Sequence, residues 1–247
     1  MCIDCGCPSP GHDHHHHKAH DHDHGHDSRT VRIEEDLLAK NDRLARANRE
    51  LFRDKGLFVL NLVSSPGSGK TSILERTLAD LGAQTGFAVL EGDQQTANDA
   101  ERIAATGVPV HQINTGAGCH LDAHMVGHGV ERFDLDAVDI LMIENVGNLV
   151  CPASFDLGED HKVAVLSVTE GEDKPLKYPQ MFQAADILLI NKIDLLPYLR
   201  FDVEKCKQFA RRVNPAIRIF ELSCHSGVGM DAWYGWLAEG VAKKRKQ

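Results

Sequence analysis

The sequence predicts an α/β domain, with a mostly parallel sheet flanked by helices, behind an N-terminal leader of unusual composition. Apolar runs of strand type, such as residues 57–63 and 187–190, alternate with helix-length segments. A glycine-rich loop, residues 64–71, joins the first of these runs to a helix. Residues 1–28 differ from the rest because they are rich in cysteine, histidine and aspartate.

Length and composition suit one folded domain with an extension. The chain has 247 residues, of which 42% are hydrophobic, and this is enough to bury one core of roughly 200 residues. We therefore divide the chain into a Cys/His-rich leader at 1–28, an amphipathic linker helix at 29–55 and the main domain at 56–247.

Charge and hydropathy argue against two classes of partner. The formal net charge is -9 at pH 7 and the only cationic run is the short tail at 243–247, so nucleic-acid binding is not expected. No stretch approaches the ~20 apolar residues that span a bilayer, and the N-terminus lacks the apolar core of a signal peptide. Because seven cysteines cannot all pair, we expect reduced thiols and a cytoplasmic protein.

The leader is predicted to bind metal ions. Cys2, Cys5 and Cys7 lie close enough in sequence to offer three sulfurs to one ion, and thiolates with nitrogen donors suit square-planar nickel(II). The His/Asp tract behind them cannot bury a core, so it should be disordered without metal. An expression tag and three exposed thiols without a partner are the alternatives. Weak nickel storage is expected at His12, His14, His15, His16, His17, His20, His22, His24 and His26.

Residues 31–52 are predicted to form an amphipathic helix. Ile33, Leu37, Leu44 and Leu51 fall on one narrow face, and charged residues fill the rest. Ser28 or Thr30 could cap its start. We expect the apolar face to pack on the main domain and the helix to link that domain to the leader, with a contact to a partner protein as an alternative.

The strongest motif is a phosphate-binding loop of the P-loop NTPase type. The strand at 57–63 is followed by SSPGSGKT and a helix at 72–81, so backbone N–H groups would surround phosphates at the helix N-terminus. Lys70 would reach the β- and γ-phosphates and Thr71 would ligate Mg²⁺. Ser64 replaces the first glycine of G-x-x-x-x-G-K-[ST], but a plain glycine-rich turn does not explain the GKT ending. The predicted phosphate contacts are Pro66, Gly67, Ser68, Gly69, Lys70, Thr71 and Ser72.

A second motif predicts guanine as the base. The sequence NKID follows the apolar run at 187–190, and the Asp194 carboxylate can accept the N1 and N2 hydrogens of guanine, a donor pair that adenine lacks. The segment ELSCHSG, after a strand at 217–222, fits the last loop that contacts the base. The predicted base contacts are Asn191, Lys192, Asp194, Ser223 and Cys224.

Between these motifs lies ENVGN, where many GTPases carry D-x-x-G. Glu144 would hold Mg²⁺ directly or through water, and the Gly147 N–H would sense the γ-phosphate. Asn148 stands where a glutamine usually positions the attacking water, so slow hydrolysis is expected. Asp93 could reach Mg²⁺ or that water, or could cap a helix that starts near residue 96. The predicted catalytic set is Lys70, Asp93 and Glu144, and the predicted magnesium ligands are Thr71, Asp93 and Glu144.

A second cluster of soft ligands is predicted inside the main domain. Cys119 and His120 are adjacent in a glycine-flanked loop, and Cys151 lies four residues after the γ-phosphate-sensing glycine. Cysteine and histidine together suit zinc or nickel, with a position left open or filled by a second subunit. His124 and His128 follow at helical spacing, and we interpret them as surface histidines that could share a face with His120.

These motifs together resemble the HypB family of hydrogenase nickel-incorporation GTPases over the whole chain. The resemblance rests on the leader cysteines, the His tract, SSPGSGKT, ENVG, NKID and the Cys-His/Cys set. It implies a P-loop fold of the SIMIBI class, shared with signal-recognition-particle and MinD-like GTPases, and a GTP-dependent homodimer. It also implies nickel insertion into [NiFe]-hydrogenase, with the hydrogenase large subunit and other maturation factors as partners.

The resemblance assigns the metals as well. It implies GTP and Mg²⁺ at the P-loop, a tight nickel site at the three leader cysteines, and zinc or nickel held by Cys119, His120 and Cys151 at the dimer interface. The leucines after NKID are either core or a partner face, and the resemblance favours a dimer contact for Leu195 and Leu199, which lie near Leu196.

Three other functions are compatible with parts of the sequence. A urease-type nickel GTPase would lack the leading C-x-x-C-x-C cluster and would carry Cys-x-His in place of adjacent Cys-His. A metal buffer with a secondary nucleotide site does not explain why Lys70, Thr71, Glu144 and Asp194 are all present. A zinc-chaperone GTPase differs in its metal, which the ligand types alone do not decide.

Overall fold

The computed structural model describes residues 25–93, 98–116 and 118–246, with side chains from residue 35 onward. The predicted leader site at Cys2, Cys5 and Cys7 and the histidines up to His24 lie outside the described residues. His26 is described in its backbone alone.

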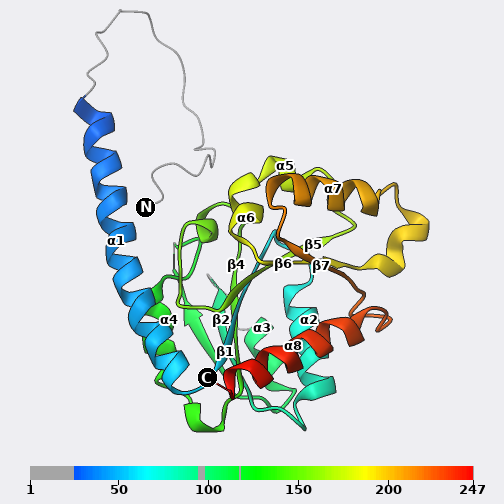
Figure 1. The fold of residues 1–247 in the computed structure, drawn as a ribbon, viewed down its shortest axis with the longest axis horizontal. Helices are drawn as coiled ribbons and strands as arrows, with labels where there is room; N and C mark the ends of the chain where they lie inside the picture. Colours follow the sequence, from blue (N-terminus) through cyan, green and yellow to red (C-terminus); the bar gives the residue numbers. More distant parts are fainter. Residues whose placement is uncertain (1–24, 94–97, 117, 247) are drawn as a thin grey trace, which may run out of the picture.

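The core of the molecule is one parallel sheet of seven strands in the order β3-β2-β4-β1-β5-β6-β7. The strand that leads into the P-loop is central, with β4 and β5 on its two sides (Figure 1). The predicted parallel α/β fold is therefore confirmed. The strands are β1 Phe58–Ser64, β2 Phe87–Asp93, β3 Val110–Asn114, β4 Ile140–Gly147, β5 His161–Ser167, β6 Ile187–Asn191 and β7 Arg218–Glu221.

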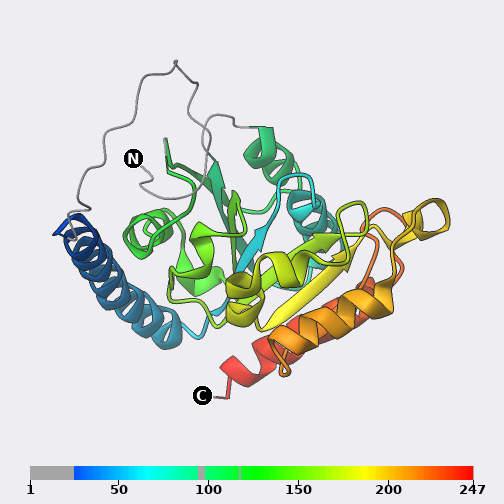
Figure 2. The same ribbon diagram turned by 90° about the horizontal axis from the view of Figure 1, so that it is seen from above.

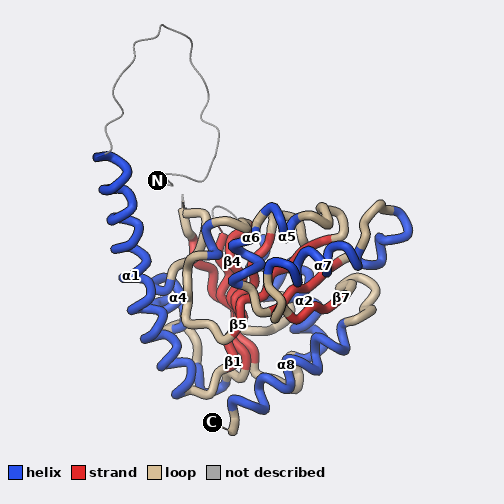
Figure 3. The backbone as a smooth tube through the Cα atoms, turned by 45° about the horizontal axis from the view of Figure 1, so that its top comes forward, coloured by secondary structure: helices blue, strands red, loops and turns tan. Residues whose placement is uncertain are grey.

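Helices cover both faces of the sheet, as Figures 2 and 3 show. One face packs on a core that includes Ile73 of α2 and Trp233 of α8. The other face packs on Phe52 of α1 at one end and on Phe182 of α6 at the other. The helices are α1 Gly25–Asp54, α2 Lys70–Leu81, α3 Asn98–Ala104, α4 Ala123–Val130, α5 Lys174–Lys177, α6 Pro179–Ala184, α7 Val203–Val213 and α8 Met230–Lys244, with 3-10 turns at Leu135–Ala137, Cys151–Ala153 and Ile193–Tyr198.

Helix α1 packs on the domain beside α4, but through a different face from the predicted one. Leu37 is 58% exposed and Leu51 is 38% exposed, whereas Ala45 and Phe52 are buried. The buried face also carries Asn48, whose amide donates to two backbone carbonyls of the domain, at 2.8 and 3.0 Å. An asparagine whose amide is satisfied can occupy a core position, so the narrow leucine face was a wrong prediction.

The start of α1 also differs from the prediction. The helix begins at Gly25, so Ser28 and Thr30 lie inside it and neither caps it. In the part of the chain that the structure describes, no helix is long and apolar enough to cross a bilayer.

Candidate nucleotide and metal sites

The P-loop leaves β1 and enters α2 with two glycines in the left-handed region, Gly67 at φ 76° and Gly69 at φ 98°. A Cβ on Gly69 would lie 2.5 Å from the Asn191 amide nitrogen, so no side chain fits there. Ser64, which replaces the first glycine, has no positive φ. Its hydroxyl oxygen accepts from Lys70 Nζ at 2.8 Å, so the serine holds the lysine over the loop. Burial lowers the pKa of Lys70.

The NKID loop lies directly against the P-loop. Asn191 Nδ2 donates to the Ser68 carbonyl at 3.0 Å, and Lys192 Nζ donates to the Gly67 carbonyl at 2.8 Å. Lys192 is the one non-glycine of the described residues with positive φ, 64°, a conformation that costs free energy unless its surroundings hold it. Asn191 Oδ1 also accepts from the Cys224 N–H at 3.5 Å, so the three predicted nucleotide loops meet at this asparagine.

The predicted guanine-reading carboxylate is already oriented. Asp194 is half-buried, and its Oδ1 accepts from the Ser223 hydroxyl at 2.5 Å. A carboxylate held at one oxygen keeps the other available for the base. Ser223 is itself buried and lies two residues after β7, the strand expected at 217–222 and observed at Arg218–Glu221.

The predicted magnesium ligands Thr71 and Glu144 are in contact. Thr71 Oγ1 donates to Glu144 Oε1 at 2.8 Å, and Glu144 is only 3% exposed. Its second oxygen, Oε2, is buried and has no hydrogen-bond partner among the described residues. Burial raises the pKa of Glu144 to about 7, against the opposing charge of Lys70. A buried carboxylate oxygen without a donor, beside a threonine hydroxyl, is an arrangement that a bound Mg²⁺ fits well.

Asp93 is the last residue of β2 and is half-buried. Helix α3 is described from Asn98 onward, and the intervening residues 94–97 lie outside the described part of the chain, so both predicted roles of Asp93 stay open. The strand order places β2 next to β4, where Glu144 pairs with Glu91, two residues before Asp93. Asp93 therefore stays a predicted ligand of Mg²⁺ or of the attacking water.

Glu91 is a further buried carboxylate beside Glu144, which was not predicted from the sequence. It pairs in register with Glu144 across β2 and β4, is 2% exposed, and has an Oε2 atom without a hydrogen-bond partner among the described residues. Burial, reinforced by the charge of Glu144, raises the pKa of Glu91 to about 8. Its signal in the sequence was a glutamate inside the apolar strand FAVLEGD, a position where a charge is costly unless it is used.

The structure brings the three predicted cluster residues together. The sulfurs of Cys119 and Cys151 are 2.9 Å apart, and Cys119 Sγ lies 3.6 Å from His120 Nδ1. One ligand atom from each of the three residues lies within 4.8 Å of the others. Burial lowers the pKa of His120, whose ring packs 3.9 Å from that of Phe155. A neutral imidazole beside two thiols is a donor set for zinc or nickel.

Two asparagines of ENVGN fasten this cluster to β4. Asn148 Nδ2 donates to the Cys119 carbonyl at 3.3 Å, and Asn145 Oδ1 accepts from the Leu121 N–H at 3.1 Å. His120 is thus held on both sides by side chains of the segment that contains Gly147. The Asn148 side chain is engaged in this contact and in a second one, in which its Oδ1 accepts from the Val150 N–H at 2.8 Å.

Lys162 of β5 supports the other half of the cluster and was also missed. Its Nζ donates to the carbonyls of Pro152, Ala153 and Phe155, at 2.8, 3.3 and 3.1 Å, just after Cys151. Lys162 is 7% exposed, and burial lowers its pKa. A buried ammonium with three carbonyl acceptors fixes the shape of the loop behind the cysteine.

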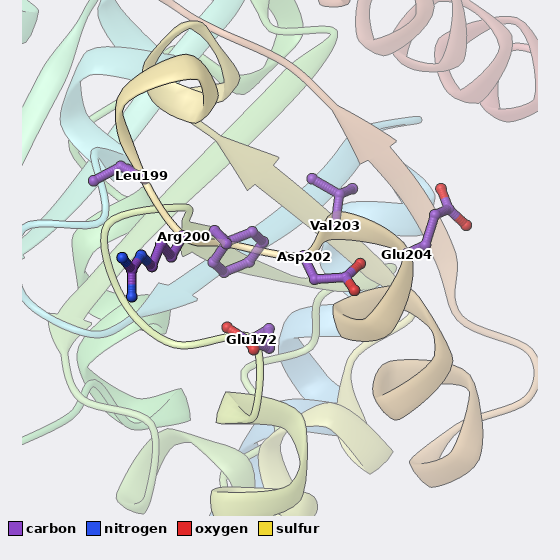
Figure 4. Close-up of a pocket in the computed structure, with 7 residues that line it drawn as sticks. Glu172, Leu199, Arg200, Asp202, Val203 and Glu204 are labelled. Atoms are coloured by element: carbon purple, nitrogen blue, oxygen red, sulfur yellow. The ribbon is translucent and has the colours of Figure 1, made fainter.

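The predicted dimer leucines fall into two groups. Leu195 and Leu196 are half-buried and pack against the core, whereas Leu199 is 38% exposed, next to Tyr198 at 83%. Leu199 also borders an open hollow of about 580 Å³, shown in Figure 4, whose other lining includes Glu172, Arg200 and Asp202. None of the predicted nucleotide or metal residues lines it.

Comparison with known proteins identifies the family of the chain. The CobW/HypB/UreG nucleotide-binding domain family matches residues 58–221. Hydrogenase maturation factor HypB of Azotobacter vinelandii is 66% identical over 210 residues, which cover 85% of this chain and 69% of that protein. The crystal structure of HypB from Helicobacter pylori in complex with nickel has a TM-score of 0.78 at 43% identity and covers 84% of this chain and 96% of its own. HypB from Archaeoglobus fulgidus has a TM-score of 0.77 at 42% identity, over 82% and 99%. The chain therefore belongs to the HypB family of hydrogenase maturation factors, P-loop GTPases of the CobW/HypB/UreG group.

Proposed function

We propose that this protein is a GTP-hydrolysing nickel chaperone, which stores nickel and delivers it under nucleotide control during [NiFe]-hydrogenase maturation. Family membership supports hydrogenase maturation. A HypB relative has been solved in complex with nickel, and Cys119, His120 and Cys151 form a donor set that nickel or zinc accepts. Nickel is the cargo, stored in the leader and passed through this cluster.

In this proposal, the residues of the P-loop, the NKID loop and β4 bind and hydrolyse GTP. Lys70 and the P-loop amides bind the phosphates, and Asp194 selects guanine. Thr71, Glu144 and Asp93 would hold Mg²⁺, which neutralises charge on the phosphates when bound. GTP hydrolysis should be slow because the Asn148 side chain donates to the Cys119 carbonyl and so does not position the attacking water.

Nucleotide control of metal binding is supported by one observation. Residues 144–151 contact both the predicted magnesium site and the Cys119/His120/Cys151 cluster. This segment begins with Glu144 against Thr71, continues through two asparagines bonded to the segment of Cys119 and His120, and ends at Cys151. A change at Gly147 between GTP and GDP would therefore be felt at both sides of the cluster. A ligand shifts such an equilibrium only by its different affinity for the two states, and the effect is reciprocal.

The test compares metal affinity of the cluster in two nucleotide states. Nickel and zinc are titrated against a chain with the leader cysteines replaced by serine and the leader histidines by asparagine, bound to GDP or to a non-hydrolysable GTP analogue. We expect affinities that differ by about 5–150-fold, the usual range of coupling. Asn148→Ala should reduce this ratio toward one without weakening nucleotide binding.

Asn214→Ala is the matched control, because Asn214 Nδ2 also donates to backbone carbonyls, but to those of Phe182, Gln183 and Ala185 instead of Cys119. It should leave the ratio unchanged. Equal metal affinities in the GDP and GTP states of the parent chain would remove nucleotide control from the proposal.

The assembly belongs to the same proposal. A GTP-dependent homodimer would use Leu199, exposed beside the guanine loop, together with Leu195. The hydrogenase large subunit and other maturation factors would be its partners, in the cytoplasm, where a thiolate cluster stays reduced.

A further inference from the structure

We infer that Arg76 of α2 is a positioning residue for guanine recognition, because its guanidinium fixes the loop at residues 223–227 so that backbone N–H groups of this loop meet the 6-oxo group of the base. The inference deepens the proposed function and rests on its assignment of GTP as the nucleotide. It adds a residue that lies outside the predicted nucleotide motifs, on the helix that begins with Lys70 and Thr71.

The Arg76 guanidinium joins α2 to the loop between β7 and α8. Its Nε atom donates to Asp80 Oδ2 at 2.7 Å, one helical turn further along α2. From the same planar group, Nη1 donates to the Cys224 carbonyl at 3.4 Å. A Cβ on Gly227 would lie 3.1 Å from Arg76 Nη2, so the guanidinium also rests against the far end of the loop. Because arginine carries its donors in a fixed fork, one side chain can hold the carboxylate and the loop together.

A tyrosine of α8 keeps the arginine in this position. Tyr234 Oη donates to Asp80 Oδ2 at 2.7 Å, the same oxygen that accepts from Arg76, and these two hydrogen bonds lower the pKa of Asp80. The neighbouring Trp233 is buried and its Nε1 donates to Thr77 Oγ1 at 3.2 Å, so α8 and α2 are packed together here. Since Asp80 already orders the guanidinium, its contact with the loop costs little further side-chain entropy.

The loop that the arginine holds begins at the predicted guanine-reading carboxylate. The Ser223 hydroxyl donates to Asp194, and the Gly227 N–H donates to the Ser223 carbonyl at 2.8 Å, which closes the loop into a tight turn. On the side of the NKID loop, the Cys224 N–H lies 3.5 Å from Asn191 Oδ1, a long and therefore weak hydrogen bond. This N–H is thus available to a stronger acceptor beside Asp194.

Guanine would present such an acceptor. Its 6-oxo oxygen is bonded to the ring carbon next to N1, so it lies beside the N1 and N2 hydrogens that Asp194 would accept. In a trans peptide, the Cys224 carbonyl and the His225 N–H point in opposite directions. A guanidinium on that carbonyl therefore fixes the direction of the His225 N–H as well. Arg76 would in this way orient two neighbouring donors for one oxygen of the base.

The experiment measures the affinity of the full chain for GDP, IDP and 6-thio-GDP, by competition with a fluorescent GDP in magnesium buffer. IDP lacks the 2-amino group that Asp194 would bind, whereas 6-thio-GDP keeps both hydrogens and replaces the 6-oxo oxygen by sulfur, a weak acceptor. The parent chain should bind GDP several-fold more tightly than either analogue. Arg76→Ala should weaken GDP binding by ~10-fold, the effect of one hydrogen bond to a charged group. It should bring the affinity ratio of GDP to 6-thio-GDP close to one and leave the ratio of GDP to IDP unchanged.

Two further variants separate geometry from charge and from folding. Arg76→Lys keeps the positive charge but has one donor atom instead of a fork, so its ratios should resemble those of Arg76→Ala. Tyr234→Phe keeps the ring and removes only the hydroxyl that holds Asp80, so the ratio of GDP to 6-thio-GDP should fall by a smaller factor. Arg49→Ala is the matched control, because Arg49 also pairs with an aspartate at 2.7 Å, Asp156, but from α1. It should change neither ratio.

Each outcome has one consequence. Equal weakening of all three nucleotides in Arg76→Ala overturns the inference, because the arginine would then support the fold and not the 6-oxo contact. Full recovery in Arg76→Lys overturns it as well, because charge alone would be enough. If Arg76→Ala does not fold, Tyr234→Phe decides, and a parent-like ratio of GDP to 6-thio-GDP in that variant overturns the inference. A parent chain that binds ADP as tightly as GDP refutes instead the proposed guanine specificity, and this result needs no variant.

Discussion

Replacing Glu144 by glutamine should make the empty protein more stable and the enzyme inactive. Glu144 is 3% exposed, accepts one hydrogen bond from Thr71 and has a second oxygen without a partner among the described residues. Burial raises its pKa from the usual 4.5 to about 7. Glutamine keeps an oxygen for the Thr71 hydroxyl and removes the charge.

The sign of the effect follows from linkage. Because the pKa of Glu144 is raised in the folded state, its carboxyl group stays protonated between pH 4.5 and 7 in the folded protein. In the unfolded chain the same group is ionised over this range. Above pH 7 both states are ionised, and the folded state carries the whole cost of a buried carboxylate. At 1.36 kcal/mol for each pH unit, the cost is about 3 kcal/mol. Glu144→Gln removes it, so the gain in unfolding free energy should be largest at pH 8 and should decline toward pH 5.

The assay is urea unfolding of parent and variant at pH 5 and pH 8, with chelator present and without nucleotide. Glu239→Gln, an exposed glutamate of α8, is the control and should show no gain at either pH. Magnesium-dependent GTP turnover should be lost in Glu144→Gln because the proposed magnesium ligand is gone. A variant that is less stable at pH 8, or that gains equally at both pH values, would refute the reasoning.

Four further outcomes are expected. Asp194→Asn should weaken GTP binding and improve binding of xanthosine triphosphate, measured by fluorescence competition; a wild type that hydrolyses ATP as fast as GTP would contradict the guanine assignment. Deleting residues 12–26 should lower the number of nickel ions bound in dialysis and leave the tight thiolate site intact. Replacing Leu195 and Leu199 by alanine should give a monomer that still binds GTP, seen by light scattering; a variant that stays dimeric or unfolds would argue against the dimer face. Lys162→Met should lower the unfolding free energy by about 3–5 kcal/mol, because it leaves three carbonyls and the buried carboxylate of Glu159, whose Oε1 lies 3.9 Å from Lys162 Nζ, without their cation, and it should weaken nickel binding at the cluster.

Much of the fold was predictable because its motifs carry their own geometry. SSPGSGKT requires a strand before it and a helix after it, and both are present as β1 and α2. NKID follows a strand for the same reason. The face of α1 was not predictable, because hydrophobic periodicity assigns asparagine to the surface. Asn41 and Asn48 are buried since their amides bond to the backbone of the domain, a fact of the tertiary structure.

The site shows the same division between local and long-range information. The cluster ligands were visible in the sequence because adjacent Cys-His and a second cysteine are unusual in such loops. The residues that hold the cluster loops in place could not be predicted. Asn145 and Lys162 are polar residues in strands, and the sequence does not show which strands or loops lie beside them. The role of Lys162 depends on the tertiary structure. With β5 paired to β1, the Lys162 amine donates to the loop after Cys151.

In the proposed mechanism, few contacts separate the γ-phosphate position from the Cys119/His120/Cys151 cluster. A Cβ on Gly147 would come within 3.1–3.2 Å of Pro66, so this glycine already rests on the P-loop. The next residue, Asn148, bonds to Cys119. A displacement of Gly147 by the γ-phosphate is thus passed on by one peptide unit and one hydrogen bond, with no need for a change in the sheet. Because the connection is mechanical and reversible, a metal ion that holds Cys119 and Cys151 together must in turn favour one position of Gly147, and so one nucleotide.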